Sequence, residues 1–168
     1  MPEISTDMIR ALREQSGAGI MDCKRALEEA DGDLERAKEL LRQLGVASAA
    51  KKISRETNQG LVESYIHSGG RIGAIVELNC ETDFVARTDQ FKGLAHDLAM
   101  QVAAMDPRYI DGDDIPEGDD INPEEACLLQ QPFIKDPTKN IQDLVNESVG
   151  RLGENVRVRR FTRFALGE

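Results

Sequence analysis

Hydrophobic side chains recur every three or four positions through residues 4–44, and this spacing predicts three short helices. Residues that start or stop helices stand between the apolar stripes, as N-caps or as breaks: Ser5, Gly17–Gly19, Asp33 and Gly45. Helices this short are marginal alone in water, so we expect them to pack on one another. The pattern therefore predicts a three-helix module at residues 1–45.

The hydrophobic period changes from three or four residues to two in the middle of the chain. A basic, alanine-rich stretch opens residues 46–59, which we predict to be a linker. From Arg71 to Cys80 nearly every second side chain is apolar, which predicts a half-buried antiparallel strand. Residues 61–67 predict its partner, because the intervening Ser68-Gly69-Gly70 is a hairpin turn signal.

The rest of the chain predicts further helices and one more strand. Apolar stripes and capping residues predict helices at residues 88–105, 122–131 and 138–149. Thr138 is the expected N-cap of the last of these. Residues 153–166 predict a strand whose alternation shifts, as it does at a β-bulge. We therefore expect an α+β fold, in which the helical module precedes a three-stranded antiparallel sheet packed with helices, in a core domain at residues 60–168.

The chain is acidic, with 21 Lys and Arg against 31 Asp and Glu, which gives a net charge of −10. Nucleic acids and anionic membranes bind proteins through positive surface, so we expect neither as a partner. Nine of the acids fall in residues 106–125, together with three prolines and two glycines. This composition predicts a solvated acidic loop.

Cysteine usage and the first residues of the chain bear on its compartment. Cys23, Cys80 and Cys127 are widely spaced and form neither a C-x-x-C pair nor a zinc pattern. Residues 1–5 have neither the basic region nor the apolar region of a secretory signal, and no apolar run is long enough to span a membrane. We therefore expect a cytoplasmic protein.

Residues suited to bond chemistry are scarce. The two histidines, His67 and His96, belong to different elements, and no Ser or Cys lies in a nucleophile motif. Gly17–Gly19 begins like a dinucleotide fingerprint but follows a helix instead of a strand. A calcium loop starting at Asp113 would need an oxygen ligand at Ile115, whose side chain has none. We therefore expect no enzyme activity, no cofactor and no metal ion.

One segment, residues 79–87, leaves the strand with the clearest alternation and enters a helix. Thr82 is its predicted N-cap, which places Asp83 and Phe84 in the first helical turn, beyond the end of the sheet. Two interpretations of Phe84 stay open: it packs against the sheet, or it protrudes as an anchor for a partner. Only 4% of the residues are aromatic, so a protruding Phe would be an unusual use of one.

Two segments are similar to the signatures of a known family. Residues 12–27 (LREQSGAGIMDCKRAL) and 77–87 (ELNCETDFVAR) resemble those of the elongation factor Ts family, the nucleotide exchange factors of translation. Residues 131–136 and 153–161 resemble the family's C-terminal part. The resemblance covers nearly the whole chain, in the family's order. It implies a module similar to ubiquitin-associated domains and a core that binds the GTPase elongation factor Tu.

The resemblance also implies which residues contact the GTPase. In the family a Thr-Asp-Phe turn inserts beside the Mg²⁺ and phosphate site, and the corresponding segment here is Thr82, Asp83, Phe84 and Val85. A second contact, made by the helical module, corresponds to Arg13, Ile20 and Met21. The implied function is guanine-nucleotide exchange, in which the turn promotes release of GDP.

An alternative function and an oligomeric state complete the expectations. The alternative is a ubiquitin-associated-like adaptor that binds peptides through residues 4–44 and has no exchange activity. This chain has one sheet-bearing unit where longer family members carry two, and residues 155–166 hold more apolar side chains than one half-buried strand needs. We therefore expect a twofold homodimer in which a second copy covers that surface.

Overall fold

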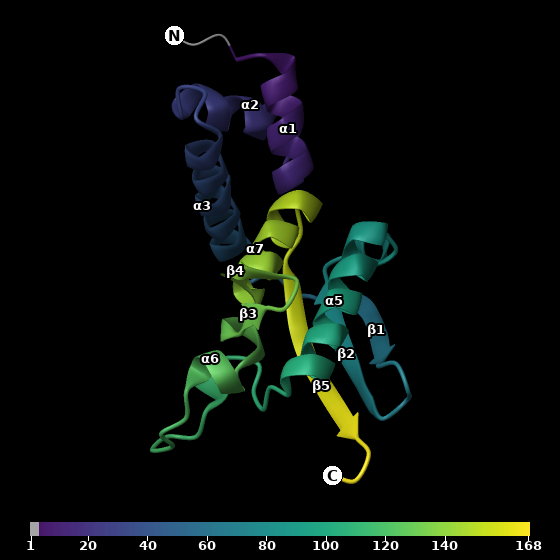
Figure 1. Ribbon diagram of the computed structural model, residues 1–168. Helices are drawn as coiled ribbons and strands as arrows, with labels where there is room; N and C mark the ends of the chain where they lie inside the picture. The colour runs from purple at the N-terminus through teal and green to yellow at the C-terminus, as the bar shows by residue number, and fades with distance from the viewer. Residues whose placement is uncertain (1–3) are drawn as a thin grey trace.

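The computed structural model describes residues 4–168, so the first three residues of the predicted helical module lie outside it. Three helices form one end of the molecule, and a sheet with its covering helices forms the other (Figure 1). The α+β class and the three-stranded antiparallel sheet are confirmed. Within residues 4–168 no helix is both long enough and apolar enough to cross a membrane.

The helical module consists of α1 (Thr6–Ser16), α2 (Ile20–Glu29) and the first part of α3 (Leu34–Lys52). Both predicted N-caps are confirmed: Ser5 Oγ accepts from the Met8 amide at 3.2 Å, and Asp33 accepts from two amides of α3. A small core holds the three helices together, formed by the buried side chains Leu12, Cys23, Ala26, Leu27, Ala30 and Ala37.

The prediction that Gly45 ends the third helix is wrong, because α3 continues to Lys52. Its second half packs along α7 (Ile141–Leu152), and a Cβ added at Gly150 would lie 3.7 Å from the Gly45 Cα. A Cβ added at Gly45 would lie 3.5 Å from the Asn146 carbonyl oxygen, an ordinary contact, so the two helices pack directly against each other here and this packing supports α3 beyond Gly45. Residues 46–52 are helical, and the division of the chain at residue 45 stays a prediction.

The sheet contains β1 (Gln59–Ile66), β2 (Ile72–Cys80) and β5 (Val156–Ala165), in the order β1-β2-β5. The predicted hairpin and bulge are both confirmed. Glu77 pairs with Arg160 while Leu78 pairs with Val158, so Arg159 is the extra residue of β5. Because the bulge adds one residue to β5, apolar side chains before and after it face the same side of the sheet, which explains the shifted alternation in the sequence.

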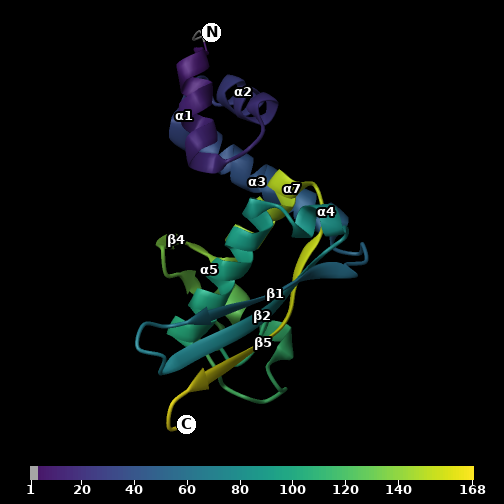
Figure 2. The same cartoon turned by 90° about the vertical axis from the view of Figure 1, so that its right-hand side faces the viewer.

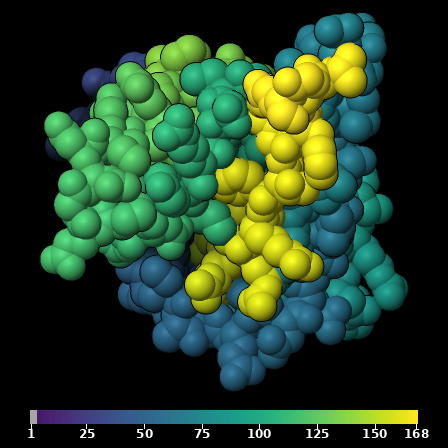
Figure 3. Space-filling view, turned by 90° about the horizontal axis from the view of Figure 1, so that it is seen from below, coloured from purple at the N-terminus to yellow at the C-terminus, as the bar shows by residue number. Residues whose placement is uncertain are grey.

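Helices cover one face of this sheet and leave the other open (Figure 2). α5 (Asp89–Met105) packs its buried stripe, which includes Phe91 and Leu98, against the inward-facing side chains of β2. The opposite face presents Ile75 from the central strand and Phe164 from β5, both exposed. Seen from below, the C-terminal strand reaches the molecular surface beside the β1–β2 hairpin (Figure 3).

The segment between α5 and α7 forms short elements: η1 (Gly112–Asp114), α6 (Pro123–Ala126), η2 (Leu128–Gln130), β3 (Pro132–Phe133) and β4 (Asp136–Asn140). The predicted helix at residues 122–131 is therefore two short turns. Thr138 is not the N-cap of α7, since it lies in β4 and Asn140 caps the helix in a capping box with Asp143. The hairpin of β3 and β4 is held by the buried Gln101, which donates to Gln131 and to the Pro132 carbonyl.

Candidate functional site

The turn after β2 forms a short helix, α4 (Asp83–Ala86), and presents Phe84 to solvent. Thr82 is its N-cap as predicted, and its hydroxyl accepts from the Val85 amide at 3.4 Å. Val85 and Ala86 face inward, whereas Phe84 is 78% exposed, the highest value among the exposed large hydrophobic side chains of residues 4–168. Phe84 is therefore not a core residue, and of the two interpretations of its position the protruding one fits the structure.

A carboxylate from a distant segment holds this turn. Glu154, which follows α7, accepts the amide protons of Glu81 at 3.1 Å and Thr82 at 3.0 Å through Oε2. Its Oε1 accepts the hydroxyl proton of Thr82 at 2.6 Å. Hydrogen bonds to an ionised acceptor are shorter and stronger than neutral ones. The backbone just before α4 is thus fixed to the start of β5.

A second set of hydrogen bonds, made by Glu81 and Asn155, also links the end of β2 to the start of β5. Glu81 Oε1 accepts from the Asn155 amide at 2.7 Å and pairs with Arg55 Nη1 at 3.4 Å. The buried Asn155 side chain donates to the backbone carbonyls of Arg55 at 2.9 Å and of Ile53 at 3.4 Å. The end of β2, the start of β5 and the residues after α3 therefore meet beneath the turn. We call the three residues Glu81, Glu154 and Asn155 the polar brace.

Asp83 and Cys80 flank the brace with different chemistry. Asp83 pairs with Arg87 at 3.1 Å on the surface, an exposed pair that contributes little to stability and leaves the carboxylate accessible. The buried thiol of Cys80 donates to the Thr82 carbonyl at 3.1 Å. Burial, reinforced by the nearby Glu154, raises the pKa of Cys80 to about 11. Cys80 is therefore a neutral structural thiol at physiological pH, because the nucleophilic form is the thiolate.

The helical module presents the other predicted contact residues on a separate surface. Arg13 lies exposed on α1, while Ile20 and Met21 begin α2 and are 52% and 65% exposed. The turn lies on the core, beside the end of α7 (Figure 2). The structure brings Thr82, Asp83 and Phe84 together and keeps them apart from the three residues of the module.

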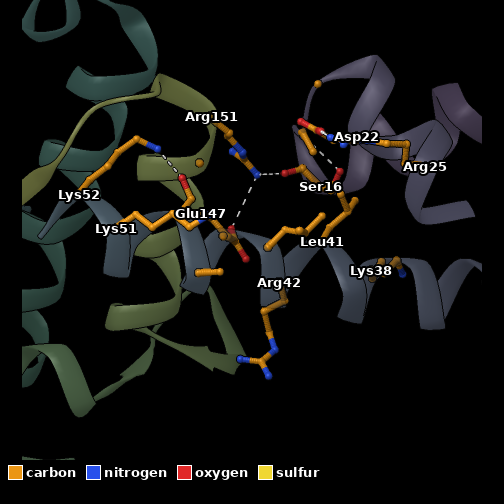
Figure 4. A pocket seen from close by; sticks show the side chains of 17 residues that line it. Ser16, Asp22, Arg25, Lys38, Leu41, Arg42, Lys51, Lys52, Glu147 and Arg151 are labelled. Atoms are coloured by element: carbon orange, nitrogen blue, oxygen red, sulfur yellow. Dashed lines mark hydrogen bonds and ion pairs between the residues drawn. The ribbon is translucent and has the colours of Figure 1, made fainter. Parts of the chain in front are cut away.

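A cleft of about 450 Å³ lies where the module meets the core, lined by α3, α7 and the loop between α1 and α2 (Figure 4). Arg151 spans it, donating to the Ser16 carbonyl at the end of α1 and pairing with Glu147 at 3.7 Å. Glycine is favoured at position 17, since its φ of +65° is a left-handed conformation that other residues adopt at a cost, and a Cβ there would displace the Arg151 guanidinium. Three other cations of the cleft, Arg25, Lys38 and Arg42, pair with acids of their own helices. Arg42 also lies 3.7 Å from Asp143 of α7, so this pair and Arg151 link the helices that meet at the cleft.

Within the described residues, no group of three His, Cys, Asp or Glu side chains is placed to hold a metal ion. The two histidines both lie near Tyr65: His67 Nδ1 is 3.0 Å from its hydroxyl, and the His96 ring packs edge-on against it. His96 also lies 3.6 Å from Glu63. These contacts belong to the rim of the sheet, away from the turn.

Comparisons with known proteins give the family. The family model described as Elongation factor TS matches residues 34–119. Proteins named Elongation factor Ts align over almost the whole chain. That of Carboxydothermus hydrogenoformans is 49% identical over 98% of this chain and 90% of its own length. That of Thermotoga maritima is 48% identical over 99% of this chain and 98% of its own. The chain therefore belongs to the elongation factor Ts family.

Proposed function

We propose that this chain promotes release of GDP from elongation factor Tu by inserting the Thr82–Phe84 turn beside the Mg²⁺ and phosphate site. Family membership supports a role in translation elongation. The observation that carries the finer proposal is the position of Phe84, which is 78% exposed on a turn that the polar brace holds in place. An exposed aromatic on a rigid support is typical of a residue that dominates an interface.

Exchange requires only that the protein and GDP weaken each other's binding to the GTPase. In this mechanism Phe84 is the wedge, while Asp83 orients the turn and disturbs the surroundings of the Mg²⁺ ion. Val85 packs behind them against the core. This mechanism involves no covalent bond made or broken, so we propose that the protein is not an enzyme and uses no cofactor of its own.

A second anchor would keep the two proteins together while the nucleotide site opens. Ile20 and Met21 expose apolar side chains at the start of α2, and Arg13 exposes a cation on α1 of the same module. α3 runs from this module to the core and packs on α7, so the two contact surfaces are joined by a continuous helix. We propose that both surfaces bind one GTPase.

The open face of the sheet supports self-association. Ile66, Gly73 and Phe164 pair in one cross-strand row, and the small glycine leaves two exposed apolar side chains on either side of it. We propose that a second copy covers this row in a twofold homodimer. As a translation elongation factor, the protein would act in the cytoplasm.

The test is the rate of GDP release from elongation factor Tu, measured by stopped-flow with a fluorescent GDP analogue. We expect Phe84→Ala to lower the stimulated rate at least tenfold. Met105→Ala is the matched control, since Met105 is an exposed apolar side chain at the opposite end of α5 and should leave the rate unchanged. An unstimulated GTPase with the wild-type protein would favour the peptide-binding adaptor instead, whereas equal rates for wild type and Phe84→Ala would remove Phe84 from the mechanism.

A further inference from the structure

Glu154 contacts the turn from a segment 72 residues farther along the chain than Thr82. Both of its carboxylate oxygens are engaged, by two backbone amides and one hydroxyl of the two residues that precede α4. The side chain is half-buried and is directed at the base of the turn rather than at the surface that Phe84 presents. Its contacts therefore act on the conformation of the turn.

The position of Glu154 is itself fixed from both sides. Gly153, at φ +73°, is the left-handed C-cap of α7, and its amide donates to the Val149 carbonyl at 2.9 Å. On the other side the buried Asn155 donates to Glu81 and to the backbone after α3. Since the residues before and after it are held, Glu154 has a rigid base from which to hold the turn.

Thr82 connects this carboxylate to the orientation of α4. Its hydroxyl donates to Glu154 at 2.6 Å, and the same oxygen accepts from the Val85 amide at the long distance of 3.4 Å. Donation to a carboxylate fixes the hydroxyl proton, which leaves the lone pairs of the oxygen directed toward the helix. This side-chain contact adds to the backbone bond from the Ala86 amide to the Thr82 carbonyl at 3.3 Å, so both groups of Thr82 hold the first turn of α4, which carries Phe84.

We propose that Glu154 is the positioning residue of the exchange turn: its carboxylate holds Thr82, Asp83 and Phe84 in the conformation that acts on the GTPase. The inference rests on the proposed function of the turn. Glu154 would act through Thr82 and Glu81 without touching the partner. Because the module supplies a separate contact surface, loss of the carboxylate should affect the maximal rate of exchange more than the affinity.

The experiment compares Glu154→Ala and Glu154→Gln with the wild type in GDP release from elongation factor Tu, at increasing concentrations of the protein. We expect Glu154→Ala to lower the maximal rate about tenfold or more, which corresponds to about 1.4 kcal/mol, because the released turn no longer holds Phe84 in the acting conformation. The half-saturating concentration should change less. Glu154→Gln should fall between, because its amide oxygen still accepts the backbone amide protons. Asp97→Ala is the control, since it removes a carboxylate paired with Lys135 at 2.6 Å, outside the turn and the brace.

A double variant separates this inference from the proposed function. If Glu154 acts through the turn, adding Glu154→Ala to Phe84→Ala should lower the rate little further. Full additivity of the two effects, or a normal rate for Glu154→Ala beside a slow Phe84→Ala, would overturn the positioning role. A normal rate for Phe84→Ala would instead overturn the function proposed for the turn.

Hydrogen exchange supplies a readout that does not depend on the partner and applies even if Glu154→Ala fails to fold. In Glu154→Gln the neutral amide oxygen still accepts these protons, but more weakly than a carboxylate does. We therefore expect faster exchange of the Glu81 and Thr82 amides, with the melting temperature within a few degrees of wild type. Unchanged protection of both amides together with an unchanged rate of GDP release would show that the carboxylate does not hold the turn.

Discussion

Phe84→Ala and Phe91→Ala should differ in their loss of unfolding free energy, because one ring is exposed and the other is in the core. Phe91 is fully buried beneath the sheet, so Phe91→Ala removes a core ring and leaves a cavity. Such substitutions cost about 3–5 kcal/mol of unfolding free energy. Phe84 is 78% exposed, so only a fifth or so of its surface is removed from water on folding. Scaled to the roughly 1.5–3 kcal/mol of a fully buried side chain, its truncation should cost about 0.5 kcal/mol.

The higher helix propensity of alanine in α4 offsets part of even that small loss. Urea unfolding followed by circular dichroism measures both variants under the same conditions, and GDP release is then measured on each folded protein. We expect Phe84→Ala to lose exchange with near-normal stability, and Phe91→Ala to lose stability first. If Phe84→Ala lost 2 kcal/mol or more, the assignment of this side chain to an interface would be refuted.

Three further predictions follow from packing, burial and the open sheet face. Gly45→Leu should lower the unfolding free energy by about 1–3 kcal/mol, because the leucine side chain would enter the contact between α3 and α7. Gly93→Ala is the control, since a Cβ there meets nothing within 4 Å and should be neutral or stabilising. Equal effects of the two variants in urea unfolding would contradict the role of helix packing at Gly45. Burial raises the pKa of Cys80 from 9.0 to about 11, so the contribution of its neutral thiol to the unfolding free energy should be complete below pH 9 and lost as pH rises toward 11. The unfolding free energy of Cys80→Ala should therefore fall less over that range than that of the wild type. Parallel profiles of unfolding free energy against pH would contradict the raised pKa. Ile75→Asp should give a monomer in light scattering at micromolar concentration where the wild type gives a dimer, whereas a wild-type monomer of 18.6 kDa at all concentrations would contradict self-association.

Local sequence signals were sufficient for much of the fold. Ser5, Asp33 and Thr82 act as N-caps because their short polar side chains satisfy amides only a few residues away. The hairpin and the bulge were also predictable, since the alternation of one strand and a Gly-Gly turn record them directly. These features depend on neighbours in the sequence.

Features that depend on distant neighbours were missed. Gly45 is a plausible helix end by local rules, but packing against α7 stabilises the helix beyond it, as far as Lys52. Thr138 and Asn140 are both acceptable N-caps, and the pairing of β4 with β3 decides between them. Glu154 lies in a segment that resembles the family's C-terminal part, yet no spacing in the sequence indicates its hydrogen bonds to Thr82.

The mutual effect of GDP and this protein on each other's binding tests the exchange mechanism most directly. Calorimetry with elongation factor Tu, free of nucleotide and loaded with GDP, gives the ratio of the two affinities for the wild type and for Phe84→Ala. We predict a much higher affinity of the wild type for the nucleotide-free GTPase, and a ratio at least tenfold smaller for Phe84→Ala, which corresponds to about 1.4 kcal/mol of lost coupling. The same ratio for both proteins would contradict the claim that the turn opposes GDP.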